Sequence, residues 1–177
     1  MVHLGTKELY SDRLILRKLR ELDAEMMFNN WCTDSDVTKY LRWLPHKNID
    51  ITKSLLKNWV NNYESDKNYL WGIELKENGQ LIGTIAVVDL DKFEIGYALS
   101  KNMWGKGIMT EALDRVIKFF FEEVGAEKIV SWHDILNPAS GKVMLKVGMR
   151  YIGNEKNYYI NPFGEKIEVA KYEIIKK

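Results

Sequence analysis

The chain has 177 residues, 26 Lys and Arg against 25 Asp and Glu, and a formal net charge of +1. This near balance argues against a broad basic surface for nucleic acid. The single cysteine, Cys32, excludes an internal disulfide and favours a reducing compartment, and it lacks an activating partner nearby. The sequence shows no apolar signal core and no membrane-spanning run. We therefore expect one cytoplasmic domain over residues 1–177, with no membrane partner.

The first hundred residues combine helical and alternating apolar patterns. These patterns predict, in chain order, a strand over 11–19, helices over 22–31 and 49–63, and strands over 69–75, 81–88 and 93–100. Asn78-Gly79 is a hairpin turn signal between two of these strands. Residues 37–45 carry Tyr40 and Trp43 but show no clear period. The middle of the chain is therefore predicted to be an antiparallel meander.

The second part of the chain begins with a wide apolar helical stripe from Ile108 to Val124, and Gly125 follows in the position typical of a helix end. Asn137-Pro138 supplies a cap and a first-turn proline for a second helix, which reaches Val147. Strands are predicted over 128–132, 151–160 and 166–175. The order predicts an α/β (α+β) fold, with one mixed, mostly antiparallel sheet of about seven strands flanked by about four helices.

The segment Met103-Trp-Gly-Lys-Gly-Ile-Met-Thr-Glu-Ala112 places a loop with two glycines directly before a helix. Glycines let the backbone approach a ligand closely, and the first helical amides lack intrahelical partners, so such a junction suits a phosphate or pyrophosphate. It is not a P-loop, because Lys106 is followed by Gly107 rather than Ser or Thr. A dinucleotide fingerprint would need three glycines. Taken alone, the motif favours an ordinary strand-to-helix turn.

Three pieces in this order resemble the GNAT superfamily of acetyl-CoA-dependent N-acetyltransferases. They are the strand with Glu94, the loop Trp104-Gly-Lys-Gly-Ile-Met109, and Asn137-x-x-Ser140 followed by Lys146-Val-Gly-Met149. The opening Ser11-Asp-Arg-Leu-Ile-Leu-Arg17 is similar to the start of the RimJ/RimL-type branch, whose best-known members acetylate N-termini of ribosomal proteins. The resemblance covers essentially the whole chain. It implies acetyl-CoA as cosubstrate and a sheet whose strands splay at the CoA site.

The resemblance also implies which residues contact CoA. Trp104 occupies the family's Gln/Arg position and Gly107 its first glycine, whereas Met109 departs from the usual Gly/Ala and must point away from the phosphates or crowd them. Asn137 is similar to the residue that binds the pantetheine region, although Asn-Pro is also a plain capping pair. The implied CoA contacts are Leu99, Ser100, Trp104, Gly105, Lys106, Gly107, Ile108, Met109, Thr110, Asn137 and Ser140.

Glu94 resembles the catalytic glutamate of histone-type members and is our candidate general base; the alternative is an ordinary outward-facing strand glutamate. Many relatives place a proton-donating tyrosine where this chain has Met144. Ser140 and Tyr151 are then the candidate donors to the leaving thiolate, with Tyr158 or Tyr159 as further choices.

Two further residues are candidate substrate contacts. His133 ends a strand close to Asn137, although a lone histidine is more often structural. Trp43, with Pro45, is a candidate lining of the acceptor pocket, although most aromatic residues are core. Too few Cys and His occur in register for a metal site.

The expected reaction is direct acetyl transfer in a ternary complex, because no nucleophile triad for a covalent intermediate is evident. The acceptor is either a protein N-terminal amine or a small-molecule amine, and the chain is either a monomer or a homodimer. An acyl-CoA-binding sensor with little turnover is the alternative function, and Met109 and Met144 keep it open.

Overall fold

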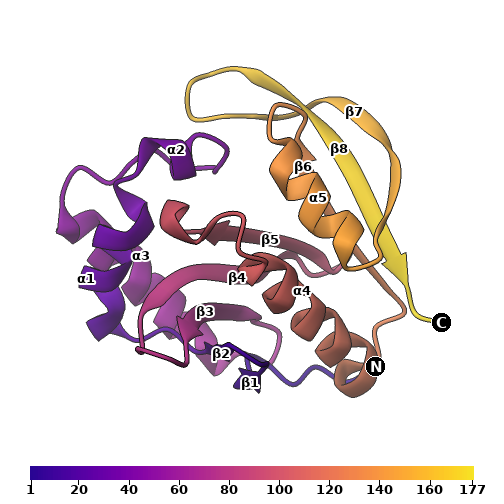
Figure 1. Cartoon of the computed structure of the whole chain (residues 1–177), viewed down its shortest axis with the longest axis horizontal. Helices are drawn as coiled ribbons and strands as arrows, with labels where there is room; N and C mark the ends of the chain where they lie inside the picture. Colours follow the sequence, from indigo (N-terminus) through magenta and orange to yellow (C-terminus); the bar gives the residue numbers. More distant parts are fainter.

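A computed structural model describes all residues from 1 to 177. One sheet of eight strands has the order β1-β2-β3-β4-β5-β6-β8-β7 (Figure 1). Only the β5–β6 pair is parallel. The strands are β1 Leu9–Tyr10, β2 Leu14–Arg17, β3 Leu70–Leu75, β4 Leu81–Asp89, β5 Glu94–Leu99, β6 Lys128–Asp134, β7 Arg150–Ile160 and β8 Lys166–Ile175. The predicted mixed α/β fold is confirmed, with the short strand β1 as an addition.

Five α-helices accompany the sheet: α1 Ala24–Met27, α2 Ser35–Thr38, α3 Ile49–Asn61, α4 Ile108–Phe119 and α5 Pro138–Lys146. The helix predicted over 22–31 is wrong as a continuous α-helix, because α1 is followed by a π-helical turn over Phe28–Cys32. A second π-helical turn ends the α4 segment before Gly125, whose φ of 81° gives the predicted helix end. Helix α2 occupies part of the segment that lacked a clear period.

The helices cover the two faces of the sheet. The apolar stripe of α4, with Met109, Leu113 and Val116, belongs to the larger buried cluster together with Leu16 of β2 and Ile95 of β5. Residues of α1, the first π-helical turn and α3 form a second cluster on the opposite face, with Met27, Trp31, Leu56, Leu70 and Leu81. Figure 1 shows α4 and α5 next to each other, with α1 and α3 on the other side of the central strands.

Strands β5 and β6 are joined by only two residue pairs, Glu94↔Val130 and Ile95↔Ser131. The hydroxyl of Ser131 donates to the carbonyl oxygen of Ile95 over 2.7 Å at this point, which we call the fork. Beyond it, the rest of β5 has no backbone partner on the β6 side. The predicted splay of the strands is thus confirmed. None of the helices combines the length and apolar character that crossing a bilayer requires.

Candidate active site

The glycine loop turns sharply between β5 and α4. Gly105 and Gly107 have φ values of 73° and 74°, in the left-handed region where a side chain is strained. Gly107 is the N-cap of α4 and has no side chain that could occupy the free amides of the first turn. A Cβ built on Gly105 would meet no atom within 4 Å, so this side of the loop is open. The loop therefore presents an unobstructed helix N-terminus of the kind that binds anions.

Met109 does not crowd this loop. Its side chain is 4% exposed and lies in the larger core cluster, as does that of Ile108. The bulky residue at the family's Gly/Ala position thus points away from the open side of the loop. Trp104 turns back to β5, where its indole Nε1 donates to the Leu99 carbonyl oxygen over 2.8 Å. Trp104 therefore connects the loop to the end of the strand.

Arg13, just before β2, holds the loop from outside. Its Nη1 donates to the Lys106 carbonyl oxygen over 2.9 Å, and its Nε pairs with Glu111 Oε2 over 2.7 Å. The other Glu111 oxygen accepts from the Ser11 hydroxyl and the Arg13 amide. Burial alone would raise the pKa of Glu111, but these hydrogen bonds and the Arg13 charge outweigh it and lower the pKa. Sequence analysis missed this contact because it joins positions about a hundred residues apart.

Glu94 begins β5 at the fork and is 4% exposed. Its Oε1 accepts from the Trp132 indole Nε1 over 2.6 Å, and its Oε2 accepts from the Tyr158 hydroxyl over 3.0 Å. Burial and the neighbouring carboxylate raise the pKa of Tyr158 to about 12, so this hydroxyl stays protonated and donates. The alternative of an outward-facing strand glutamate is therefore wrong. Glu94 is a buried carboxylate held by donors from β6 and β7.

Helix α5 begins beside the splayed strands. Asn137 is its N-cap residue and Pro138 its first residue, as predicted, but the Asn137 side chain makes no capping hydrogen bond. Instead, Asn137 Nδ2 donates to the Ser140 hydroxyl oxygen over 3.2 Å. The Ser140 carbonyl oxygen accepts from the Tyr97 hydroxyl of β5 over 3.1 Å. The structure thus brings Asn137 and Ser140 together, and Tyr97, which sequence analysis did not single out, joins them to β5.

The family model for the GNAT acetyltransferase domain matches residues 13–150. The uncharacterized N-acetyltransferase YoaA of Bacillus subtilis is 31% identical over 173 residues, which cover 95% of this chain and 96% of the relative. A GNAT-family acetyltransferase of Bacillus anthracis has a similar structure, with a TM-score of 0.82, 26% identity and coverage of 96% and 98%. The ribosomal-protein-S5-alanine acetyltransferase of Vibrio fischeri has a TM-score of 0.74 and 19% identity, covering 96% of each chain. The chain belongs to the GNAT family.

The family assignment makes this chain an acetyl-CoA-dependent N-acetyltransferase, as predicted. The similarity to the RimJ/RimL-type branch predicted from the opening residues is confirmed by the putative ribosomal N-acetyltransferase YdaF of Bacillus subtilis, which is 30% identical over 179 residues, covering 94% of this chain and 93% of the relative. The loop of Gly105 and Gly107 fits the anionic cosubstrate of the family, because a Cβ on Gly105 would meet no atom within 4 Å and the side chain beside Gly107 is the cationic Arg13.

Several predicted site residues of this acetyltransferase lie apart from Glu94. Alternation along β6 puts His133 on the face opposite Trp132, where its Nδ1 lies 2.7 Å from the Asp134 carbonyl oxygen and its Nε2 lies 3.3 Å from the Tyr172 hydroxyl. Tyr151 also packs on Tyr172, and its hydroxyl donates to Asn154 Oδ1 over 2.8 Å. The structure therefore does not bring His133 or Tyr151 together with Glu94.

The side chains of Ser100 and Met144 also point away from the splayed strands. Ser100 is 3% exposed, and its hydroxyl lies 2.8 Å from the Asn30 carbonyl oxygen, in the π-helical turn. The backbone of Ser100 is engaged as well, because its amide donates to the Ile82 carbonyl oxygen over 2.8 Å and its carbonyl oxygen accepts from the Met103 amide over 3.0 Å. The predicted contact of Ser100 with the cosubstrate is therefore wrong. Met144 is 1% exposed and lies in the larger core cluster. The position of the missing tyrosine is therefore filled by core packing.

The aromatic residues near the acceptor side are arranged differently from the prediction. Trp43 lies 4.7 Å from the His46 ring and packs against the cluster of α1 and α3. Its neighbour Arg42 instead reaches the sheet, with Cζ 5.3 Å from the Trp132 ring and 5.4 Å from the Tyr159 ring. The basic residue, rather than the predicted tryptophan, thus stands beside the partners of Glu94.

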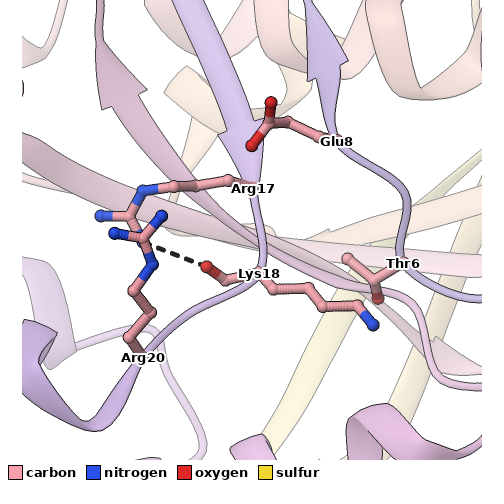
Figure 2. Close-up of a pocket in the computed structure, with 5 residues that line it drawn as sticks. All are labelled: Thr6, Glu8, Arg17, Lys18 and Arg20. Atoms are coloured by element: carbon pink, nitrogen blue, oxygen red, sulfur yellow. Dashed lines mark hydrogen bonds between the residues drawn. The ribbon is translucent and has the colours of Figure 1, made fainter.

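A cationic hollow at the far end of the sheet is structural rather than catalytic. Thr6, Glu8, Arg17, Lys18 and Arg20 line it (Figure 2). Arg17 donates to both oxygens of Asp23 over 2.8 and 2.9 Å and to Glu74 over 2.5 Å, so its guanidinium is paired within the protein. Strands β3 and β4 separate this hollow from β5.

Proposed function

We propose that this acetyltransferase moves the acetyl group from acetyl-CoA directly to a primary amine while both are bound. The observation that carries the proposal is Glu94, a buried carboxylate at the fork where β5 and β6 part. The glycine loop at the opposite end of β5 supplies the anion site for the CoA pyrophosphate. The cosubstrate arm is then expected to follow the unpaired edge of β5, as an added strand does.

Residues 104–110 would hold the pyrophosphate through backbone amides, since Met109 and Ile108 point into the core. The backbone of Leu99, at the unpaired edge of β5, would meet the pantetheine arm. Asn137 and Ser140 lie across the gap on α5, tied to β5 by Tyr97. A backbone amide near Leu99 would polarise the thioester carbonyl, a contribution often worth several kcal/mol in acyl transfer. We further propose that residues 1–177 act as one catalytic domain.

Glu94 is suited to remove a proton from the acceptor amine. A lysine amine has a pKa near 10.4 and an α-amine one near 8, so both are mostly charged at neutral pH and must lose a proton before attack. A carboxylate offers about four lone-pair sites, and the Trp132 and Tyr158 donors use only two of them. Glu94 can thus accept the proton directly or through an ordered water.

Ser140 is suited to stabilise the leaving thiolate by donating a hydrogen bond to it. The Asn137 amide donates to its hydroxyl oxygen, which leaves the hydroxyl hydrogen free to donate elsewhere. A covalent acyl-enzyme is not supported, because the only thiol, Cys32, is fully buried and burial raises its pKa to about 12. The amine nitrogen bonds to the acetyl carbon, Glu94 takes up the amine proton, and the C–S bond breaks. CoA leaves as a thiolate that Ser140 hydrogen-bonds and that water protonates.

The test of this function is the pH dependence of Glu94→Gln. We expect kcat/KM to fall about a hundredfold at pH 7, and the loss to shrink towards pH 9.5, where more of the amine is already neutral. Glu77→Gln, an exposed turn variant, is the matched control and should behave as the parent. If kcat/KM of the parent and of Glu94→Gln depended on pH in the same way, Glu94 would not be the general base. Tight CoA binding without amine-dependent thiol release across an amine panel would instead favour the sensor function.

A further inference from the structure

Residues 35–46, which we call the strap, cross the open side of the splayed strands. Asp36 Oδ2 pairs with Lys101 Nζ over 2.5 Å, just after β5. Farther along the strap, the Tyr40 hydroxyl donates to the Leu136 carbonyl oxygen over 3.0 Å, just after β6. The backbone of His46 returns to the π-helical turn, where its amide donates to the Cys32 carbonyl oxygen over 2.8 Å. The strap is therefore fastened at the ends of both strands that form the site.

Arg42 lies on the strap, and its guanidinium carbon lies over the rings of Trp132 and Tyr159, at 5.3 and 5.4 Å from their centroids. Such a cation–π contact attracts the charge of the guanidinium and uses none of its five N–H donors in a conventional hydrogen bond. No hydrogen bond and no carboxylate within ion-pair distance engages Arg42, although every other arginine of the chain except Arg20 has such a carboxylate partner. Arg42 is thus held in place by the two rings while its donors remain available.

The same indole also contacts Glu94. Trp132 donates from Nε1 to Glu94 Oε1 over 2.6 Å, while Arg42 lies over its face. The unpaired cation and the candidate base therefore both contact the same side chain, Trp132. A ligand that placed its amine at Glu94 would have its neighbouring groups within reach of the Arg42 donors.

Given the function proposed above, we propose that the preferred acceptor is an amine that carries a carboxylate or phosphate group, which Arg42 binds. Guanidinium donors match the two oxygens of such anions bidentately, so the contact fixes the orientation of the acceptor as well as its affinity. The cation–π contacts with Trp132 and Tyr159 favour this position of the guanidinium. Arg42 thereby sets specificity, and Glu94 supplies the chemistry.

The experiment compares matched amines that differ only in the anion. Phosphoethanolamine is set against ethanolamine, and β-alanine against β-alaninamide, to separate phosphate from carboxylate. Peptides beginning Ser-Glu and Ser-Gln test whether the anion can belong to a protein N-terminus. We expect at least one anionic member to have a kcat/KM about tenfold or more above its neutral partner. Arg42→Gln should abolish this preference by raising KM for the anionic member, whereas Arg42→Lys should retain part of it.

Lys47→Gln removes an exposed charge next to the strap and should leave the preference unchanged. Equal kcat/KM for all matched pairs, or a preference that Arg42→Gln does not alter, would overturn the inference while leaving acetyl transfer intact. A rise in KM for acetyl-CoA alone in Arg42→Gln would also overturn it, because Arg42 would then serve the cosubstrate. Calorimetric binding of the same amines in the presence of CoA gives a readout without turnover. Anion-selective binding that depends on Arg42 would support the inference even if no acetyl transfer occurred.

Discussion

The Tyr97 hydroxyl donates to the Ser140 carbonyl oxygen over 3.1 Å and so joins β5 to α5 beyond the last backbone pair of β5 and β6. Burial raises the pKa of Tyr97 well above its usual range, so the phenol remains a neutral donor throughout the working pH range. Strand β5 and helix α5 are therefore linked by a side-chain hydrogen bond in the region where β5 and β6 make no backbone hydrogen bonds.

Tyr97→Phe should lower kcat about five- to tenfold, because α5 and its Ser140 hydroxyl lose their tie to β5. KM for acetyl-CoA should change little, since the glycine loop is held separately by Arg13 and Trp104. Steady-state kinetics with both substrates varied measures the two effects. Tyr172→Phe, which removes another buried phenol beside α5, is the control. An equal loss of kcat in Tyr97→Phe and Tyr172→Phe would show that the effect comes from side-chain packing around α5 and not from the hydrogen bond to Ser140.

Met109→Ala should destabilise the fold by about 2–5 kcal/mol, because the side chain fills the larger core cluster rather than the ligand side of the loop. KM for acetyl-CoA should stay within about twofold of the parent value, since the backbone amides are unchanged. Urea unfolding and initial rates measure the two quantities. Tighter acetyl-CoA binding with unaltered stability would show that Met109 crowds the cosubstrate after all.

Glu111→Gln should raise KM for acetyl-CoA several-fold, because Arg13 loses the carboxylate that positions it against Lys106. The lowered pKa of Glu111 also fixes a pH dependence. Its contribution to stability is present above the ordinary value of 4.5 and is lost as pH falls through the lower folded-state pKa. The difference in the free energy of unfolding between the parent and Glu111→Gln should therefore become smaller as the pH is reduced from 7. Glu122→Gln, exposed in the next turns of the same segment, should show neither effect.

Cys32 should be unreactive towards a thiol reagent in the folded protein at pH 8, because it is fully buried and its pKa lies at about 12. Its labelling rate should rise with the unfolded fraction across a urea titration. The raised pKa also means that its contribution to stability is complete below about pH 9 and is lost as pH approaches 12. Rapid labelling in the absence of urea would contradict the burial of this thiol.

Local patterns predicted the meander, the glycine loop and the helix after it, because period, turn residues and caps act within a few positions. The breaks in the helical stretches were not predictable in this way. Phe28–Cys32 and Phe120–Val124 keep helical spacing in sequence, but each takes one wider turn in the structure. The two-residue strand β1 is too short for any period and forms because Leu9 pairs with Leu16.

The site was predictable where the motif is contiguous and not where it depends on tertiary contacts. Spacing identified Glu94, but its donors Trp132 and Tyr158 come from strands 38 and 64 residues away. Arg13 lies in the opening motif but had no predicted role, and Arg42 belongs to no motif. Both reach the site only through folding. His133 was singled out for its closeness in sequence to Asn137, yet strand alternation turns it to the other face.

The closed end of the V formed by β5 and β6 is fastened by both ends of the chain. The Val2 amide donates to the Val124 carbonyl oxygen, and the Lys176 amide donates to that of Glu127, on the connection that enters β6 (Figure 1). The two backbone pairs and these terminal contacts thus fix the end from which β5 and β6 diverge. Removing the residues at either end of the chain should widen the angle between β5 and β6. The terminal residues would then influence the affinity for the cosubstrate, although they lie far from where it binds.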